Sequence, residues 1–143
     1  MKPNPLHSVT DVQFGLAQAA WRAFTSPDPT AIERFIEMDT SALPFVAAAF
    51  RRHLEQFPSV DGGLSRTERQ ALSILREQGS VPGGHLFAAV QRLEEQIFMG
   101  DSSFYRTIAN LSNGRYPLLQ ASDTPQASLG TVTITEAGRN VIE

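Results

Sequence analysis

The sequence predicts a mainly α-helical protein in which N-terminal helices pack on a C-terminal unit that ends in a small antiparallel β-hairpin. Three observations predict this class. Apolar residues recur at spacings of three and four through most of the chain, capping signals open several of these segments, and alternating segments occur only near the end. The 143 residues, 41% of them hydrophobic, are enough for a real core. We expect residues 1–10 to be a flexible lead, 11–62 a helical N-terminal part and 63–143 the C-terminal unit.

The N-terminal part should hold three helices. The first runs from about Asp11 to Phe24, and Ser8 with Asp11 three residues on predicts a capping box in front of it. A second capping box, Thr30 with Glu33, opens a short helix, and a third helix starts around residues 42–44. On the first helix two adjacent apolar stripes make a wide face, so we expect that helix to be deeply buried or shared with a second subunit.

The C-terminal unit opens with the strongest start signal of the chain. Ser65 caps a helix that runs to about Gln78, Glu68 reaches back to complete a capping box, and Gly79 should end the helix with a positive φ. Residues 81–84 then form a short connection to a helix at about residues 85–96, on which Leu86, Val90, Leu93 and Ile97 should face inward.

A third helix of this unit should begin at the N-cap Asp101 and end before Gly114. Its apolar positions Phe104, Ile108 and Leu111 predict one inward face. A short strand around residues 116–120, a loose turn at 122–130 and a strand at Thr131–Ile134 follow, and Thr135 caps a last helical turn that ends at Ile142. Helix, helix, helix, strand, strand and helix, in this order, predict a winged helix-turn-helix.

Several sequence words resemble a family of uncharacterised bacterial proteins. These words are Leu43-Pro-Phe, His53-Leu-Glu-Gln-Phe-Pro-Ser59, Gly63-Leu-Ser-Arg-Thr-Glu-Arg-Gln70 and Met99-Gly-Asp-Ser-Ser-Phe104. Roughly from Gln13 onward, the chain looks like the C-terminal half of those proteins, where such a segment follows an N-terminal domain of unknown function. The resemblance implies no established activity, and it implies that the N-terminal domain is missing here. The segment Ile134–Arg139 is also similar to the wing-to-helix segment of winged-helix transcription regulators.

The leading functional hypothesis is a non-enzymatic winged-helix binding module, with double-stranded DNA as its expected partner and transcriptional regulation as its expected role. The outward side chains of the 101–113 helix suit base edges and phosphates, because Arg and Asn read guanine and adenine and Ser holds phosphate. We therefore expect DNA contacts from Ser103, Arg106, Asn110 and Asn113, with backbone contacts from Arg69, Arg76 and Arg115.

Charge argues against a strong DNA binder. The net charge is −3, and from Gly63 to Glu143 seven arginines and no lysine stand against eight acidic residues. The expected wing, residues 122–130, contains no basic residue. Since phosphate neutralisation supplies most non-specific affinity, such a module would depend on dimer avidity or on a partner.

The alternative is a protein-interaction or dimerisation scaffold that binds no nucleic acid. Phe14, Trp21 and Phe24 on the first helix would be its anchors, and the partner would be a second copy, another protein or the missing N-terminal domain. Those aromatic residues could instead form the core between the helical part and the winged helix. A third class, an enzyme subdomain that acts only with the missing domain, stays open behind these two.

Catalytic and cofactor-binding patterns are absent from the sequence. There is no cysteine, the three histidines have no metal-ligand spacing, and no nucleophile elbow, P-loop or dinucleotide fingerprint occurs. We therefore predict no enzyme, no cofactor and no metal site. No run of 18 apolar residues and no signal-peptide pattern occur, so we expect a cytoplasmic protein of bacterial type without membrane contact.

Overall fold

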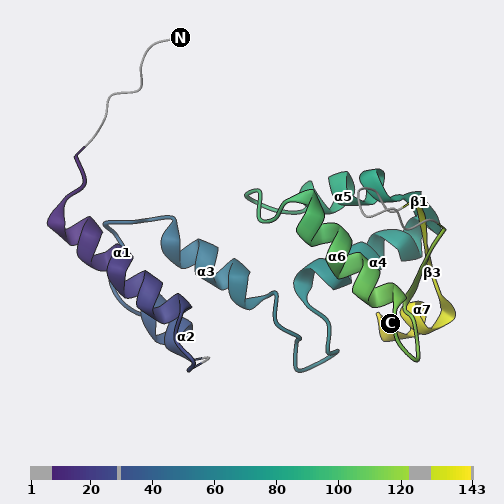
Figure 1. Cartoon of the computed structure of the whole chain (residues 1–143), viewed down its shortest axis with the longest axis horizontal. Coiled ribbons are helices and arrows are strands. Elements are labelled where there is room, and N and C mark those ends of the chain that lie inside the picture. Colours follow the sequence, from purple (N-terminus) through teal and green to yellow (C-terminus); the bar gives the residue numbers. More distant parts are fainter. Residues whose placement is uncertain (1–7, 29, 123–129, 143) are drawn as a thin grey trace, which may run out of the picture. The chain divides into compact units, whose positions relative to one another are not determined.

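The computed structural model describes residues 8–28, 30–122 and 130–142. The protein is mainly helical: 54% of the described residues are in helices, and a small three-stranded antiparallel sheet accompanies them. The chain divides into two compact units, unit 1 (Met1–Leu54) and unit 2 (Glu55–Glu143), which are considered separately (Figure 1). Most of the expected lead and most of the expected turn at 122–130 lie outside the described residues.

Unit 1 holds the three expected helices, α1 (Asp11–Phe24), α2 (Ala31–Ile36) and α3 (Val46–Leu54). The predicted bounds of α1 are confirmed, but its capping box is not the predicted Ser8–Asp11 pair. Thr10 is the N-cap: its Oγ1 accepts from the backbone N of Gln13 at 3.2 Å, and Gln13 Oε1 accepts from Thr10 N at 3.0 Å. A capping box joins the N-cap to the third helical residue, so the start at Asp11 selects Thr10 and Gln13.

The core of unit 1 is small. Its buried apolar side chains are Ala20, Ile32, Phe35 and Ala47. Aromatic contacts extend it: the Phe50 ring lies edge-on to Phe35 at 5.3 Å and stacks on Phe24 at 6.3 Å. Since most of α1 is not buried, the expectation of a deeply buried first helix fails, and only the side around Ala20 faces the core.

Unit 2 begins with α4 (Arg66–Gln78) and contains α5 (Gly83–Gln91), α6 (Asp101–Ser112) and α7 (Glu136–Val141). The predicted capping box of α4 is confirmed, with Ser65 N donating to Glu68 Oε2 at 2.7 Å and Glu68 N to Ser65 Oγ at 3.3 Å. Gly79 follows with the expected positive φ, 78°.

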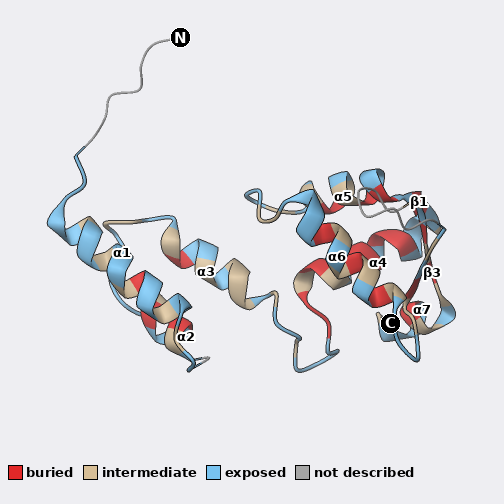
Figure 2. Cartoon of the chain, viewed as in Figure 1, coloured by how far each residue is buried: buried red, intermediate tan, exposed pale blue. Residues whose placement is uncertain are grey.

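One continuous core holds unit 2 together. Figure 2 shows buried residues running along α4 and α6. The core side chains are Leu64, Ala71, Leu72, Ile74, Leu75, Val81, Leu86, Val90, Phe104, Ile108, Leu111, Leu119, Val132 and Ile134. The inward face predicted for α6 is therefore confirmed. The N-cap predicted at Asp101 is wrong by one residue, because Gly100 is the N-cap and Asp101 is the first helical residue.

The sheet contains a strand that the sequence analysis missed. In addition to β2 (Leu119–Ala121) and β3 (Thr131–Ile134), residues Ser80–Pro82 form β1, so the expected plain connection is wrong. The strand order is β1-β3-β2, both pairs are antiparallel, and Val81 lies opposite Val132. A three-residue strand carries no visible alternation, and its partner residues lie 49 to 53 positions away in the sequence, so a local pattern could not reveal it.

Helix α5 is shorter than predicted. It ends at Gln91 instead of about residue 96, and the expected core residues Leu93 and Ile97 are 52% and 87% exposed. The following loop instead buries Glu94, whose side chain is 3% exposed and lies 3.5 Å from the Arg66 guanidinium. This pairing across the fold overrides the apolar spacing on which the longer helix was based.

Helix α7 closes unit 2 as expected. Thr135 caps it, accepting from Gly138 N at 3.1 Å and donating to the Pro117 carbonyl oxygen at 2.8 Å. Gly138 is buried against the Leu118 carbonyl, so the helix lies close to the segment between α6 and β2. None of the helices in the described part of the chain has the length and apolar character that crossing a bilayer requires.

Candidate interaction surfaces

The outward face of α6 is polar. Because Phe104, Ile108 and Leu111 turn into the core, the positions between them face solvent. Ser103, Arg106 and Asn110, at spacings of three and four, are exposed on one side of the helix. Within the described part of the chain, the Arg106 guanidinium has no hydrogen-bond or ion-pair partner. The structure thus brings three of the predicted DNA-contacting residues together, with one uncommitted cation among them.

The ends of α6 are partly satisfied by the helix itself. Asn113, the C-cap, is exposed and its Nδ2 donates to the Ala109 carbonyl oxygen at 2.8 Å. At the other end, Asp101 Oδ1 accepts from the backbone N of Ser102 at 2.7 Å and from its hydroxyl at 3.2 Å. The Asp101 carboxylate therefore stabilises the first turn, where the positive end of the helix dipole also favours it.

The remaining predicted arginines lie on other elements. Arg69 and Arg76 are exposed on α4, seven residues apart and so on one side of that helix. Arg76 Nη1 donates to the Ile142 carbonyl oxygen at 3.0 Å, which ties α4 to the end of α7. Arg115 is exposed in the loop after α6, with its guanidinium carbon 5.5 Å from the centre of the Tyr116 ring. Arg76 and Arg115 thus have structural contacts besides any ligand.

A shallow hollow of about 520 Å³ with a mixed polar and apolar lining adjoins the C-terminal end of α6. Its hydrogen-bonding side chains include Ser112, Asn113, Gln120, Ser122 and Thr131. Of these only Asn113 was predicted as a site residue. Alternation along β2 and β3 is the signal that could have found Gln120 and Thr131, since Leu119 and Val132 turn inward and their neighbours turn outward.

Arg66 has a structural role. Its ion-pair partners are Glu55, at 2.8 Å, and Glu94, at 3.5 Å. The hydrogen bond that Arg66 donates to Glu55 is the main reason why the pKa of Arg66 is raised, and the charge of Glu94 adds to it. Arg66 therefore links the start of unit 2 to the α5–α6 loop and is not available to a ligand.

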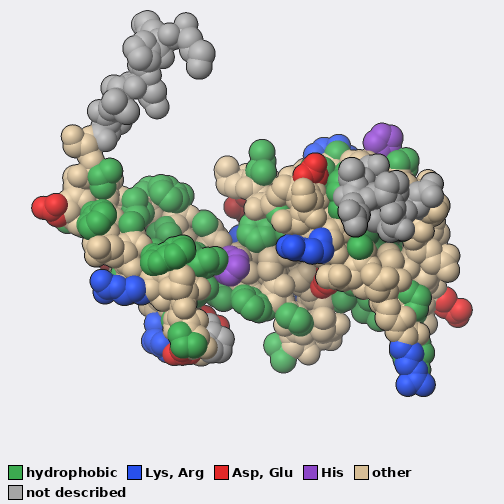
Figure 3. Space-filling view, in the orientation of Figure 1, with side chains coloured by type: hydrophobic (Ala, Val, Ile, Leu, Met, Phe, Trp, Pro, Cys, Tyr) green, Lys and Arg blue, Asp and Glu red, His purple; other side chains and the backbone are tan. Residues whose placement is uncertain are grey.

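The second surface is on α1. Phe14, Trp21 and Phe24, the predicted interface residues, are 60%, 65% and 48% exposed. Phe24 also meets the His53 ring at 5.2 Å, so it belongs partly to the core of unit 1. Figure 3 shows hydrophobic side chains gathered on unit 1. Between two of the aromatic rings lies a hollow of about 400 Å³, lined by Phe14, Ala17, Gln18, Trp21 and Arg22.

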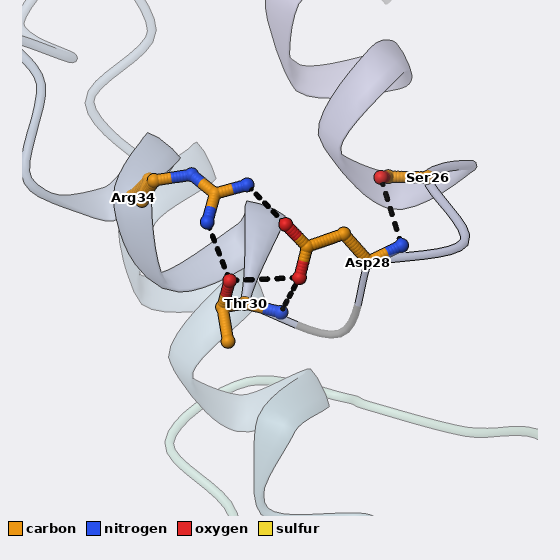
Figure 4. Close-up of polar contacts among 4 residues, drawn as sticks. All are labelled: Ser26, Asp28, Thr30 and Arg34. Atoms are coloured by element: carbon orange, nitrogen blue, oxygen red, sulfur yellow. Dashed lines mark hydrogen bonds and ion pairs between the residues drawn. The ribbon is translucent and has the colours of Figure 1, made fainter.

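A polar cluster stands in front of α2 (Figure 4). The predicted Thr30–Glu33 capping box is wrong, because Asp28 takes that place: its Oδ1 accepts from Thr30 N at 2.9 Å and from the Thr30 hydroxyl at 2.8 Å. Arg34 reaches back to Asp28 Oδ2, and this hydrogen bond is the largest cause that lowers the pKa of Asp28 to about 2. Every member has a partner, so the cluster orders the turn that leads into α2.

Metal chemistry and relatives give no further lead. In the residues that the structure describes, no three His, Asp or Glu side chains group so that they could hold a metal ion. No protein-family model matches the chain, and neither the curated proteins nor the solved structures contain a match. The resemblance to uncharacterised bacterial proteins therefore stays a prediction.

Proposed function

We propose that unit 2 is a non-enzymatic winged helix-turn-helix module that binds double-stranded DNA through α6. The observation that carries the proposal is the topology: α4, β1, α5, α6, β2 and β3 follow one another, and β3 lies between β1 and β2 in an antiparallel sheet. A winged helix-turn-helix has this order, with a strand after its first helix and a hairpin after its third. The third helix, here α6, is then the one that enters the major groove.

The exposed side chains of α6 support this role. Arg106 and Asn110 have the donors and acceptors that pair with guanine and adenine edges, and Ser103 in the first turns suits phosphate. Four residues along a helix rise about 6 Å, close to two base-pair steps of about 3.4 Å each. Arg106 and Asn110 could therefore contact bases two steps apart in one groove.

Few charges would anchor the module to the backbone. Of the exposed arginines of unit 2, the proposal uses Arg106 together with Arg69, Arg76 and Arg115, which gives at most four phosphate-neutralising groups. The neutral side chains of the hollow beside α6, such as Gln120 and Thr131, would add hydrogen bonds without charge. Since the logarithm of the binding constant falls by about 0.9 per neutralised phosphate for each decade of salt, we expect a shallow slope of about −2 to −4.

The test is fluorescence anisotropy of a labelled random-sequence duplex, titrated with the full chain at several salt concentrations. Arg106→Ala should weaken binding about fivefold or more at low salt and reduce the salt slope by about one. Arg139→Ala is the matched control, because Arg139 is an exposed arginine on α7, and it should bind like the wild type. No binding at low salt, or equal losses in both variants, would overturn the proposal.

A second candidate function is protein interaction through α1. The observation that favours it is the exposure of Phe14 and Trp21, two large apolar side chains on one side of a helix. In this function unit 1 is an interaction surface, and unit 2 needs no nucleic acid. The DNA-binding proposal implies a cytoplasmic location, because bacterial DNA is found there. The protein-interaction proposal implies no particular location.

A further inference from the structure

We propose that α1 pairs with α1 of a second copy of this chain, antiparallel and about a two-fold axis. The inference rests on the second candidate function, in which the aromatic side of α1 is an interaction surface. It adds the identity of the partner, which is a second copy of this chain. It is carried by three features of the helix: where the exposed side chains lie, the shape of the surface between them, and the placement of its two charges.

The exposed side of α1 lies opposite Ala20, which packs into the core of unit 1. Phe14, Gln18 and Trp21, at spacings of four and three, lie along this side and are all exposed. Asp11 and Arg22 continue it toward the two ends of the helix. The exposed stripe thus runs through nearly the whole helix, with its aromatic residues in the middle and a charge near each end.

The order of residues along this stripe suits a two-fold pairing. A two-fold interface uses the same patch on both subunits, so the patch must be complementary to itself. The hollow over Ala17 and Gln18 lies between the rings of Phe14 and Trp21. An antiparallel pairing centred between residues 17 and 18 places Phe14 opposite Trp21 of the second copy. The two hollows would then face each other at the centre, with a pair of aromatic rings on either side.

Charge selects the antiparallel direction. Asp11 and Arg22 are the only charged residues of α1, and within the described part of the chain neither side chain has a hydrogen-bond or ion-pair partner. Antiparallel pairing brings Asp11 of one copy within a turn of Arg22 of the other, at both ends of the interface. Parallel pairing would instead set like charges side by side and align the two helix dipoles, both of which are unfavourable.

The area of the stripe predicts a weak, reversible dimer. A fully buried aromatic side chain contributes about 150–250 Å², so Phe14 and Trp21 at their observed exposures offer roughly 200–300 Å² per copy. Two copies would bury roughly 400–600 Å² of aromatic surface, less than the ~1,200–2,000 Å² of stable specific complexes. Dissociation should therefore fall in the micromolar range and be visible by dilution.

The test combines sedimentation velocity with tryptophan emission over the micromolar range, on the full chain. Trp21 is the single tryptophan, so its emission reports on this surface alone. The wild type should pass from monomer to dimer while the emission shifts to shorter wavelength. Phe14→Ser should weaken the dimer about ten- to hundredfold, as expected for the loss of one buried Phe. Val12→Ser is the matched control, since Val12 is exposed off this stripe, and it should leave the dimer intact.

Charge reversal tests the direction. Asp11→Arg and Arg22→Asp should each weaken the dimer, and the double variant should restore it, because the two charges meet again with their signs exchanged. Both reversals disfavour α1 itself by opposing its dipole, so restoration cannot come from a more stable helix. A parallel dimer would show no restoration, and that result would overturn the antiparallel arrangement. Far-UV circular dichroism confirms that each variant keeps its helices.

A monomer at every concentration would overturn the inference, and the emission of Trp21 then separates its two parts. Emission typical of solvent-exposed tryptophan would remove the second copy as partner and leave the α1 surface open to another protein. Emission typical of buried tryptophan in a monomer would remove the interaction surface as well. A dimer that Phe14→Ser does not weaken would place the contact elsewhere on the chain.

Discussion

Gly138 is the position at which unit 2 should tolerate a side chain least. A Cβ on this residue would overlap the Leu118 carbonyl oxygen and lie 2.9 Å from Ile134 Cγ1. The carbonyl cannot yield freely, because it accepts from Thr135 N at 3.1 Å. Gly138→Ala must therefore shift α7 or the segment that leads into β2.

The magnitude follows from three contributions. Overpacking a core position costs about 1–3 kcal/mol. Straining the Thr135–Leu118 hydrogen bond costs about 1 kcal/mol more. The higher helix propensity of alanine offsets about 1 kcal/mol of this loss. The variant should thus be less stable by about 2 kcal/mol, and for a unit of this size the melting temperature should fall by roughly 8–16 °C.

Urea and thermal unfolding measure this effect. The transitions are monitored by far-UV circular dichroism and by the fluorescence of the two tyrosines, which both belong to unit 2. The control is Gly15→Ala on α1, where an added Cβ meets no atom within 4 Å. There the same exchange should stabilise the helix by about 1 kcal/mol. A Gly138→Ala midpoint equal to or above that of the wild type would refute the close packing of α7.

Three further outcomes are expected. Ser65→Ala should lower the free energy of unfolding by about 1 kcal/mol, and adding Glu68→Ala to that variant should lower it little further, because the two side chains form one capping box. The urea midpoints of the two single variants and the double variant test this. Arg66→Ala should cost about 1–3 kcal/mol, as it removes the Arg66 guanidinium from the buried Glu94 side chain, and adding Glu94→Gln should recover part of that loss in a double-mutant cycle. Asp28 has a pKa of about 2 in the folded protein, below its ordinary value of 3.8, so its contribution to stability is complete above about pH 4 and is lost as the pH falls toward 2. The difference in unfolding free energy between the wild type and Asp28→Asn should therefore vanish over that pH interval.

The parts of the fold that local sequence determines were predictable. The bounds of α1, the Ser65–Glu68 box, the cap at Thr135 and the inward face of α6 each depend on residues within one or two turns of one another. Capping and periodicity act at that range, so the pattern and the structure agree.

Most of the wrong predictions concern features that depend on contacts between residues far apart in the sequence. β1 exists because β3 pairs with it, and α5 ends early where Glu94 turns toward Arg66. The capping predictions for α1 and α2 were wrong for a different reason. At each site two candidate hydroxyl or carboxyl groups lie close together in the sequence, and the sequence did not indicate which of them would accept the hydrogen bond. In the candidate DNA-binding surface, the α6 face was predictable from periodicity. The hollow beside it was not, because it forms where α6 meets the sheet.

The low charge of unit 2 connects the two proposals. With at most four arginines in its proposed DNA-binding surface, unit 2 should bind a single site weakly, whereas two copies that also touch through α1 gain from each other on one duplex. Wild-type binding to a long duplex should therefore be cooperative. Phe14→Ser should abolish the cooperativity and leave the affinity for a short, single-site duplex unchanged. Arg106→Ala should lower the affinity for both the short and the long duplex and leave the cooperativity unchanged. Anisotropy titrations on both lengths separate these effects. If Phe14→Ser weakens the short duplex as much as the long one, α1 acts on DNA binding by some route other than pairing of copies, and the connection fails.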